Sequence, residues 1–233
     1  AFLLFIGTIL FLIFEYNNLS TLKDMNFIDF QLILDNFWFV FSGLPYTLGI
    51  ALTSFLTGLV LGFFISRARM SDTGILASLA RFYISIMRGV PMIVVLFVLY
   101  FGLPFYGVEL PALFCSYIAF SLVSAAYISE IFRASIQAVD KGQWEAARAL
   151  GLKEWTIISK VILPQAIRIA IPPLGNVILD MIKSTSLMAM ITVQDIFQNA
   201  KIVGGRELDY MSMYVLVAFI YWLLCYGFEI IQS

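Results

Sequence analysis

Two charged residues, Asp180 and Lys183, lie inside an otherwise apolar segment of residues 169–194. At a spacing of i, i+3 they can pair along one face of a helix. A charge in the middle of a membrane costs about 2.5–3.5 kcal/mol on insertion scales, so each side chain should face a partner or water. The pair is either a structural salt bridge or part of a substrate path in which the lysine meets a carboxylate. The candidate path residues are Asp180, Lys183, Ser184, Thr185 and Ser186.

Several other kinds of chemistry are excluded by residue type. The chain has no histidine, which removes His-based zinc sites, Ser-His triads and histidine proton relays. Cys115 and Cys225 both lie in apolar tracts and are expected to be small buried residues rather than a disulfide or a metal site. A hydrolase within the membrane, or an ion- or proton-coupled transporter, would have to use Asp180 and Lys183. The nucleotide-binding pattern G-x-x-x-x-G-K-[ST] is missing, so no catalytic residue is assigned.

The composition indicates an integral membrane protein. The chain is 61% hydrophobic and 12% charged, with a net charge of −1, whereas about 25% of the residues of a soluble domain are charged. Its uncharged tracts reach the length that crosses a bilayer. Because the backbone must satisfy its own hydrogen bonds in lipid, the spans are expected to be helices, and the fold class all-α.

Five segments are predicted to cross the membrane. They lie within residues 36–66, 89–108, 110–129, 169–194 and 210–228. The first interval is longer than one span needs, so residues 37–42 are expected at the interface and the span near Pro45. Pro172 and Pro173 are expected to break the fourth helix at its cytoplasmic start, which would put Lys183 near mid-membrane.

The apolar residues 1–14 are interpreted as a partial sixth helix; the alternative is a signal-peptide core. The predicted domains are residues 1–35, a partial N-terminal membrane helix with an outward loop, and residues 36–233, a transmembrane domain that contains a cytoplasmic loop at 130–168. Basic residues set the orientation. Three of them, Lys23, Lys201 and Arg206, fall on the outward side. Ten fall on the side predicted to be cytoplasmic: Arg67, Arg69, Arg81, Arg88, Arg133, Lys141, Arg148, Lys153, Lys160 and Arg168.

The cytoplasmic loop is predicted to form two short helices. Asp140 and Gln143 fit a capping box at the start of the first helix, and Gly151 suits the left-handed residue that ends it. The second helix is expected over residues 153–162, because Pro164 should end it. The hairpin could be merely a solvated connection between spans.

Two other charged positions flank the spans. Glu130 and Arg133 are interpreted as an anchoring pair at the membrane edge. Arg88 is interpreted as an interface residue whose long side chain reaches toward water.

The loop carries a motif in fixed register. "EAARALG" begins at Glu145, and "VILP" ends at Pro164. The pattern resembles the cytoplasmic signature of binding-protein-dependent ABC transporter permeases, and Val161 in place of Ile is its single departure. The matching positions are Glu145, Ala146, Ala147, Gly151, Val161, Leu163 and Pro164.

Further stretches resemble the polar amino acid uptake subfamily, which includes histidine and glutamine permeases. They are "RGVP" at 88–91, "AYISEIFRASIQAVDKGQWEAA" at 126–147, "LPQAIRIAIPPLGN" at 163–176 and "IKSTSL" at 182–187, with Ser184 where Asp is common. The similarity runs from about residue 44 to the end of the chain.

The resemblance implies a type I ABC importer fold in the bacterial cytoplasmic (inner) membrane. It implies that the loop couples to a cytoplasmic ABC ATPase dimer, which binds the ATP and Mg that this chain does not. It also implies a second identical or homologous permease and an extracytoplasmic amino acid-binding protein. The implied coupling residues are Glu145, Ala146, Ala147, Arg148, Ala149, Gly151, Leu163 and Pro164. The alternative is the ion- or proton-coupled transporter that uses Asp180 and Lys183.

Overall fold

The computed structural model describes residues 28–71 and 74–232, and this part of the chain is helical between short connections, without a strand. The predicted partial helix of residues 1–14 lies outside the described residues. The α-helices are α2 (Phe30–Phe41), α3 (Leu44–Arg69), α4 (Ile75–Gly89), α5 (Met92–Phe97), α6 (Ala112–Gln137), α7 (Lys141–Ala149), α8 (Glu154–Thr156), α9 (Leu163–Ser184), α10 (Ile196–Glu207) and α11 (Tyr210–Gln232). Short π and 3-10 segments are η2 (Val98–Gly102), η3 (Leu103–Tyr106), η4 (Ile157–Ile162) and η5 (Thr185–Ile191).

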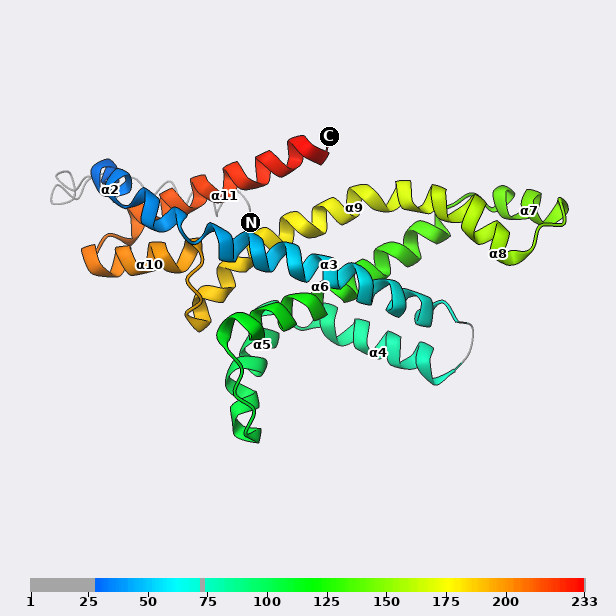
Figure 1. The fold of residues 1–233 in the computed structure, drawn as a ribbon, viewed down its shortest axis with the longest axis horizontal. Helices are drawn as coiled ribbons and strands as arrows, with labels where there is room; N and C mark the ends of the chain where they lie inside the picture. The colour runs from blue at the N-terminus through cyan, green and yellow to red at the C-terminus, as the bar shows by residue number, and fades with distance from the viewer. Residues whose placement is uncertain (1–27, 72–73, 233) are drawn as a thin grey trace, which may run out of the picture.

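Four helices are long and apolar enough to cross a membrane. They are Leu44–Arg69, Ala112–Gln137, Tyr210–Gln232 and the run Glu154–Ile191, which joins α8, η4, α9 and η5. In Figure 1 these helices extend along the length of the molecule. The fifth span is a pair of helices, Ile75–Gly89 and Met92–Tyr106, bent by 103°. Counted this way, the described chain has the five spans predicted from its sequence.

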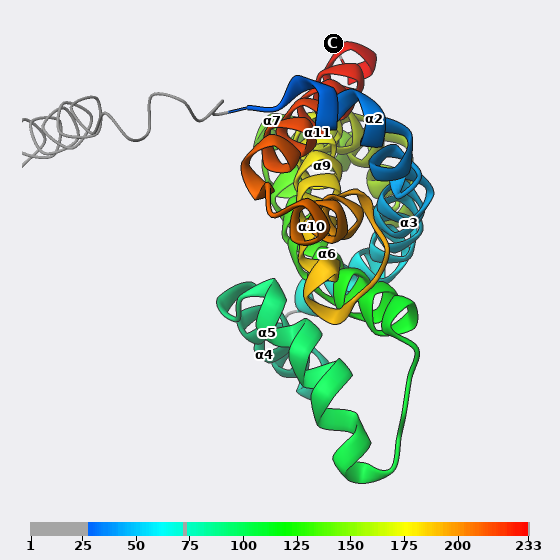
Figure 2. The same cartoon turned by 90° about the vertical axis from the view of Figure 1, so that its left-hand side faces the viewer.

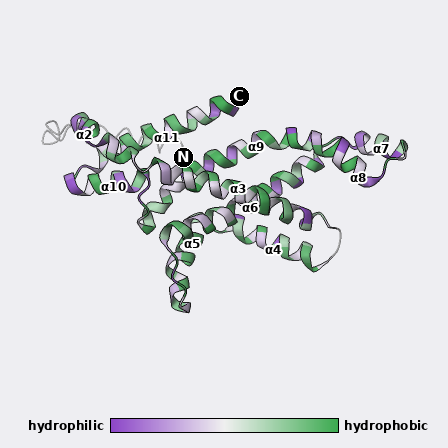
Figure 3. Ribbon diagram, viewed as in Figure 1, coloured by the Kyte–Doolittle hydropathy of each residue, from purple (hydrophilic) through white to green (hydrophobic). Residues whose placement is uncertain are grey.

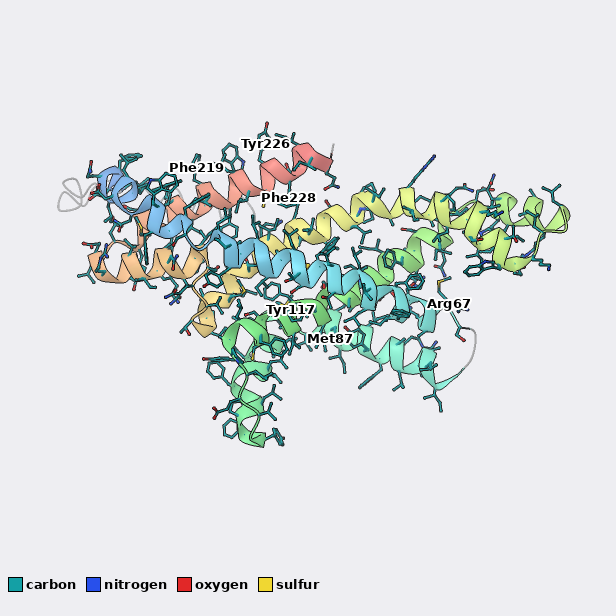
Figure 4. All side chains as sticks on the ribbon, in the orientation of Figure 1. Arg67, Met87, Tyr117, Phe219, Tyr226 and Phe228 are labelled. Atoms are coloured by element: carbon teal, nitrogen blue, oxygen red, sulfur yellow. The ribbon has the colours of Figure 1, made fainter. Side chains whose placement is uncertain are left out.

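Hydrophilic residues gather at the two ends of the molecule (Figure 3). One end holds the α7–α8 hairpin, and the other holds α2 and α10. Arg67, in the last turn of α3, lies toward the hairpin end (Figure 4). Lys201 and Arg206 belong to α10 at the opposite end. Arg67 of one predicted group of basic residues and Lys201 and Arg206 of the other therefore lie toward opposite ends of the molecule, as the orientation argument requires.

The start of the second span differs from the prediction. The sequence predicts a span over residues 89–108, but the helix begins at Ile75, and α5 leaves the body of the molecule at the bend (Figure 2). The arginines of α4 look like loop-flanking charges in the sequence, yet each has a polar neighbour. Arg81 donates to the Ser78 hydroxyl at 3.0 Å, and Arg88 lies 3.8 Å from Glu130.

The prolines do not break the fourth predicted helix. α9 runs unbroken through Pro172 and Pro173, so the predicted break is wrong. The prolines leave the carbonyls of Arg168 and Ile169 without their usual helical donors, and neighbouring groups can satisfy such freed carbonyls within a membrane helix. The Gln232 amide also ties α11 to this part of α9 by donating to the Pro172 carbonyl at 3.1 Å. Nor does Pro164 end the preceding helix. It lies in the first turn of α9, where no amide donor is needed, and a π turn carries the chain into it from α8.

Small residues let α3 and α6 pack closely along much of their length. A Cβ added at Gly58 would lie 2.3 Å from the Ser124 hydroxyl oxygen, and one at Gly62 would lie 2.9 Å from an Ile128 methyl carbon. Small residues allow such close backbone approach between membrane helices. Across the same interface the hydroxyls of Thr57 and Tyr117 lie 2.7 Å apart; Tyr117 is labelled in Figure 4.

Gly58→Ala is expected to lower the unfolding temperature of the detergent-solubilised protein, because the new methyl collides with Ser124. Gly49→Ala on the same helix is the matched control, since no atom lies within 4 Å of the position that its Cβ would occupy. The control should be neutral or stabilising, by up to about 1 kcal/mol, because alanine favours helix. Thermal melts followed by circular dichroism measure both. Equal effects of the two substitutions would contradict this account of the α3–α6 contact.

Away from the α3–α6 contact, an apolar cluster joins α2, α10 and α11 around Val40, Ile196, Val203, Met213 and Leu216. Asp195, fully buried at its edge, caps α10 by accepting a hydrogen bond from the Gln198 amide at 2.8 Å. The Tyr221 hydroxyl donates to its other oxygen at 3.4 Å. Burial raises the pKa of Asp195 to about 6, because no described cation pairs with this carboxylate.

Asp195 should therefore make the fold less stable at alkaline pH. A carboxyl whose pKa is raised by folding stabilises the folded state most below its unfolded pKa of about 4, and that stability is lost as the pH rises through about 6. Asp195→Asn keeps a good capping side chain but does not titrate. The difference in unfolding temperature between pH 5 and pH 8 is expected to shrink in the variant. An unchanged difference would contradict the assignment.

Candidate functional site

The connection between α6 and α9 folds into a helical hairpin at one end of the molecule (Figure 1). α7 begins after Asp140, whose carboxylate accepts a hydrogen bond from the Gly142 amide at 2.7 Å, so the predicted cap is confirmed. The predicted capping box is only half formed. Gln143 does not fold back to the cap; its side-chain oxygen accepts from Gln165 on α9 at 3.2 Å. This bond ties the hairpin to the helix that follows it.

A tight turn closes the hairpin. Gly151 has a φ of 70°, the left-handed conformation predicted for it. The Leu152 amide donates to the Ala147 carbonyl at 3.3 Å, which satisfies a free carbonyl at the helix end. Arg148 and Glu154 pair across the turn at 2.9 Å. These contacts fix the angle between α7 and α8.

The two faces of the hairpin differ. Ala147 is buried in a small apolar cluster with Val139, Ile157, Ile162 and Ala166. The outer face leaves Leu150 and Trp155 78% and 77% exposed among charged residues. The other predicted coupling residues are all exposed: Glu145, Ala146, Arg148, Ala149, Gly151, Leu163 and Pro164. Exposed apolar side chains of this size at a charged, water-facing end are typical of a protein-binding surface.

A second candidate site is a pocket of about 590 Å³ at the bend between α4 and α5. Its walls come from the bend itself, from α6 and from α9. The lining residues are Arg88, Gly89, Val90, Pro91, Met92, Val123, Ser124, Tyr127, Val177, Asp180, Met181, Lys183 and Ser184. A volume of this size is sufficient for a small-molecule ligand.

Three of the five predicted path residues line this pocket. The amine of Lys183 lies 2.8 Å from an Asp180 carboxylate oxygen, so the predicted i, i+3 pair forms. Ser184 joins them. Thr185 and Ser186 do not line it; their hydroxyls donate to backbone carbonyls of the turn before, at 2.6 Å and 2.8 Å.

Glu130 is the centre of a larger ionic cluster than the sequence predicts. Its carboxylate lies 3.1 Å from Arg133, the expected partner, and also 3.1 Å from Arg69 and 3.8 Å from Arg88. Its side chain is 14% exposed. One carboxylate therefore holds three guanidinium groups and links the ends of α3 and α4 to α6.

Arg88, interpreted from the sequence as an interface residue, lies in the pocket wall together with Tyr127, which the sequence does not single out. The Arg88 guanidinium lies over the Tyr127 ring, 5.4 Å from its centre. Arg88 precedes Gly89-Val90-Pro91, and a charge beside Gly and Pro within an apolar span is the signal that could have pointed to a broken helix there.

Neither site resembles a metal centre or a thiol site. Among the residues that the structure describes, no group of three or more His, Cys, Asp or Glu is placed to hold a metal. Cys115 and Cys225 are both free thiols, and Cys115 is buried. The chemistry of the pocket is that of charge and shape.

Residues 58–233 match the model of the family of binding-protein-dependent transport system inner membrane components. The chain belongs to this family. It is a multi-pass inner-membrane permease, and its match covers every span but the first part of α3.

The permease has relatives across most of its length. It is 55% identical over 195 residues to the probable amino-acid ABC transporter permease protein YckA of Bacillus subtilis (strain 168), covering 84% of this chain and 86% of the relative. It is 40% identical over 218 residues to the L-cystine transport system permease protein TcyB of the same organism, covering 93% of each. Both relatives are named as permeases, and the first as an ABC transporter permease, as the loop motif predicts.

Solved structures share the fold. One chain from a crystal structure of an amino acid ABC transporter with histidines has a TM-score of 0.85 and 34% identity, covering 88% of the permease and 96% of that chain. A chain of the MetNI methionine ABC transporter, in an inward facing conformation, has a TM-score of 0.66 at 18% identity, covering 85% and 96%. The second likeness shows the fold alone. The predicted ABC importer fold is confirmed.

Proposed function

We propose that the permease is the membrane-spanning subunit of an ATP-driven ABC importer for a polar amino acid. The observation that carries the proposal is the α7–α8 hairpin, which presents the Glu145–Gly151 motif and the exposed Leu150 and Trp155 at a charged end of the molecule. Relatives at 55% and 40% identity carry names that describe amino-acid or cystine transport, which supports the substrate class.

The hairpin is proposed to dock on a cytoplasmic ABC ATPase. Its outer face offers Glu145, Ala146 and Ala149 for close approach, while Ala147 packs inward and ties the motif to α9. Gly151 sets the turn, and Leu163 with Pro164 begins the helix that leads to the pocket. In this scheme an ATPase dimer binds ATP and Mg, and the permease contributes no catalytic residue.

The pocket at the α4–α5 bend is proposed to lie on the substrate path. Asp180, Lys183 and Ser184 line it. Thr185 and Ser186 do not line the pocket, but their hydroxyls bond the backbone carbonyls of the preceding turn and so shape the start of η5. A broken span beside a pocket is how many transporters form a binding site within the membrane.

The remaining partners follow from the same scheme. An extracytoplasmic binding protein delivers the amino acid, and a second permease, identical or homologous, completes the path. Residues 36–233 act as the transmembrane domain, with residues 130–168 as the coupling loop. When ATP draws the ATPases together, the hairpin moves with them and α9 tilts at the pocket.

The test is uptake by the permease reconstituted in vesicles with its native ATPase and binding protein. A panel of amino acids is offered with and without ATP. Uptake of at least one polar amino acid that requires ATP is the expected result. Uptake that ignores ATP and follows an ion gradient would overturn the proposal in favour of an ion-coupled transporter.

A further inference from the structure

The pocket wall carries three formal charges from the described residues. Arg88 comes from the end of α4, and Asp180 and Lys183 come from α9. Two cations and one carboxylate give this part of the wall a net charge of +1. A wall with an unbalanced charge distinguishes ligands by their own charge.

The two cations are not equivalent. Lys183 is neutralised by Asp180, whose carboxylate oxygen lies 2.8 Å from its amine. Arg88 has only a long contact of 3.8 Å with Glu130. That carboxylate is already held at 3.1 Å by both Arg69 and Arg133. Arg88 is therefore the cation of the pocket that is least compensated.

Arg88 is also placed to reach a ligand. Its side chain is 45% exposed, and its guanidinium lies over the Tyr127 ring, which limits the directions it can take. A guanidinium offers a planar pair of donors that fits a carboxylate with two parallel hydrogen bonds. An amino acid presents such a carboxylate whatever its side chain is.

We infer that Arg88 binds the α-carboxylate of the transported amino acid and that the pocket selects amino acids with an uncharged side chain. The inference rests on the proposed function. With a zwitterion bound, the wall and ligand together keep a charge of +1, whereas a cationic side chain raises the charge to +2. The free oxygen of Asp180 is left to receive the α-ammonium group.

Acidic side chains are disfavoured for a different reason. The second cation, Lys183, already has a carboxylate partner, so a ligand's second carboxylate would have to displace Asp180. The rest of the wall is largely apolar, from Val90, Met92 and Val177 among others. Such a wall suits a neutral side chain of moderate size.

The test is direct binding of radiolabelled amino acids to the purified permease–ATPase complex, without the binding protein, so that selectivity is that of the permease. Glutamine and methionine are the probes with uncharged side chains, arginine is the cationic probe, and glutaminamide lacks the carboxylate. The best neutral probe is expected to bind at least about tenfold more tightly than arginine, and glutaminamide should not compete with it.

Four variants separate the roles of Arg88 and Lys183. Arg88→Gln should weaken binding of the neutral probe at least about tenfold, and Arg88→Lys should restore part of it. Arg81→Gln, on the same helix but outside the pocket, is the control and should bind normally. Lys183→Gln, at a half-exposed site that should tolerate the change, removes one positive charge. The ratio of the affinity for the neutral probe to the affinity for arginine should therefore become smaller, because the wall repels a cationic side chain less.

The outcomes distinguish this inference from the proposed function. If arginine binds as tightly as the neutral probes, or Lys183→Gln leaves the preference unchanged, the inference is overturned, while ATP-dependent uptake still upholds the importer. If no amino acid binds and no uptake depends on ATP, the inference about Arg88 and the proposed importer function are both overturned. Loss of binding in Arg88→Gln together with a narrowed preference in Lys183→Gln supports the inference.

Discussion

Glu145→Arg is expected to abolish ATP-dependent uptake while the permease remains folded. Glu145 is exposed on α7, and no described residue forms an ion pair with it. A surface substitution of this kind changes stability by about 0.5 kcal/mol or less. A reversed charge in the centre of a docking surface, in contrast, costs several kcal/mol of binding. Uptake in vesicles should fall at least about tenfold.

Retention of the ATPase on the tagged permease during purification gives a second measurement, which should fall in parallel. Asp35→Arg is the matched control, because it makes the same acid-to-base change at an exposed site on α2, at the opposite end of the molecule. The control should keep the ATPase bound. If Glu145→Arg retains both the ATPase and uptake, the hairpin is not the coupling site.

Glu130→Gln is expected to be the most destabilising single change in the ionic network. Glu130 is the only acidic group within 4 Å of Arg69, Arg88 and Arg133 among the described residues. Its removal leaves three guanidinium groups close together without a counter-charge. Breaking a buried ion pair costs about 3–5 kcal/mol, and the partial exposure of the arginines favours the lower figure. The measurement is the unfolding temperature in detergent.

Glu154→Gln provides the comparison, because it breaks an ion pair of similar length whose two side chains are exposed. Glu154 and Arg148 lie 2.9 Å apart, but their side chains are 62% and 57% exposed. Exposed pairs contribute about 0–1 kcal/mol, so its unfolding temperature should hardly change. Should Glu130→Gln fail to purify, Arg133→Gln, which leaves two arginines on the carboxylate, is expected to give an intermediate loss. Equal losses for Glu130→Gln and Glu154→Gln would contradict the assignment.

The spans could be predicted because lipid imposes a local rule on sequence. Charge-free intervals of sufficient length indicate where helices cross, and the starts of α3, α6 and α11 follow from them, whereas α6 continues eight residues past its predicted end at residue 129. The rule fails where a charge is satisfied by a distant residue. Arg88 looks like the end of a loop until Glu130, on another helix, is seen beside it. The 103° bend has a local signal in Gly89 and Pro91, but the size of its angle does not follow from that signal.

The two candidate sites differ in how far sequence reveals them. The hairpin is local, so Asp140 and Gly151 could be assigned from capping preferences alone. The pocket is assembled from several helices. The sequence points only to its α9 wall, because Asp180 and Lys183 are charged residues within an apolar segment. Proline was misleading in this helix, because the expectation of a break at Pro172 applies to isolated helices in water and not to one supported by its neighbours.

The continuity of Glu154–Ile191 has a mechanical consequence. Its 38 residues form a rod that is about 55 Å long at ~1.5 Å per residue. The rod begins in the hairpin and carries Asp180 and Lys183 on one wall of the pocket, while other parts of the wall belong to the α4–α5 bend and to α6. In the proposed coupling scheme, the rod would act as a lever whose hairpin end is moved by the ATPase. Because the helix is continuous from the hairpin to the pocket, a small rotation at the hairpin end would then shift the wall that carries Asp180 and Lys183.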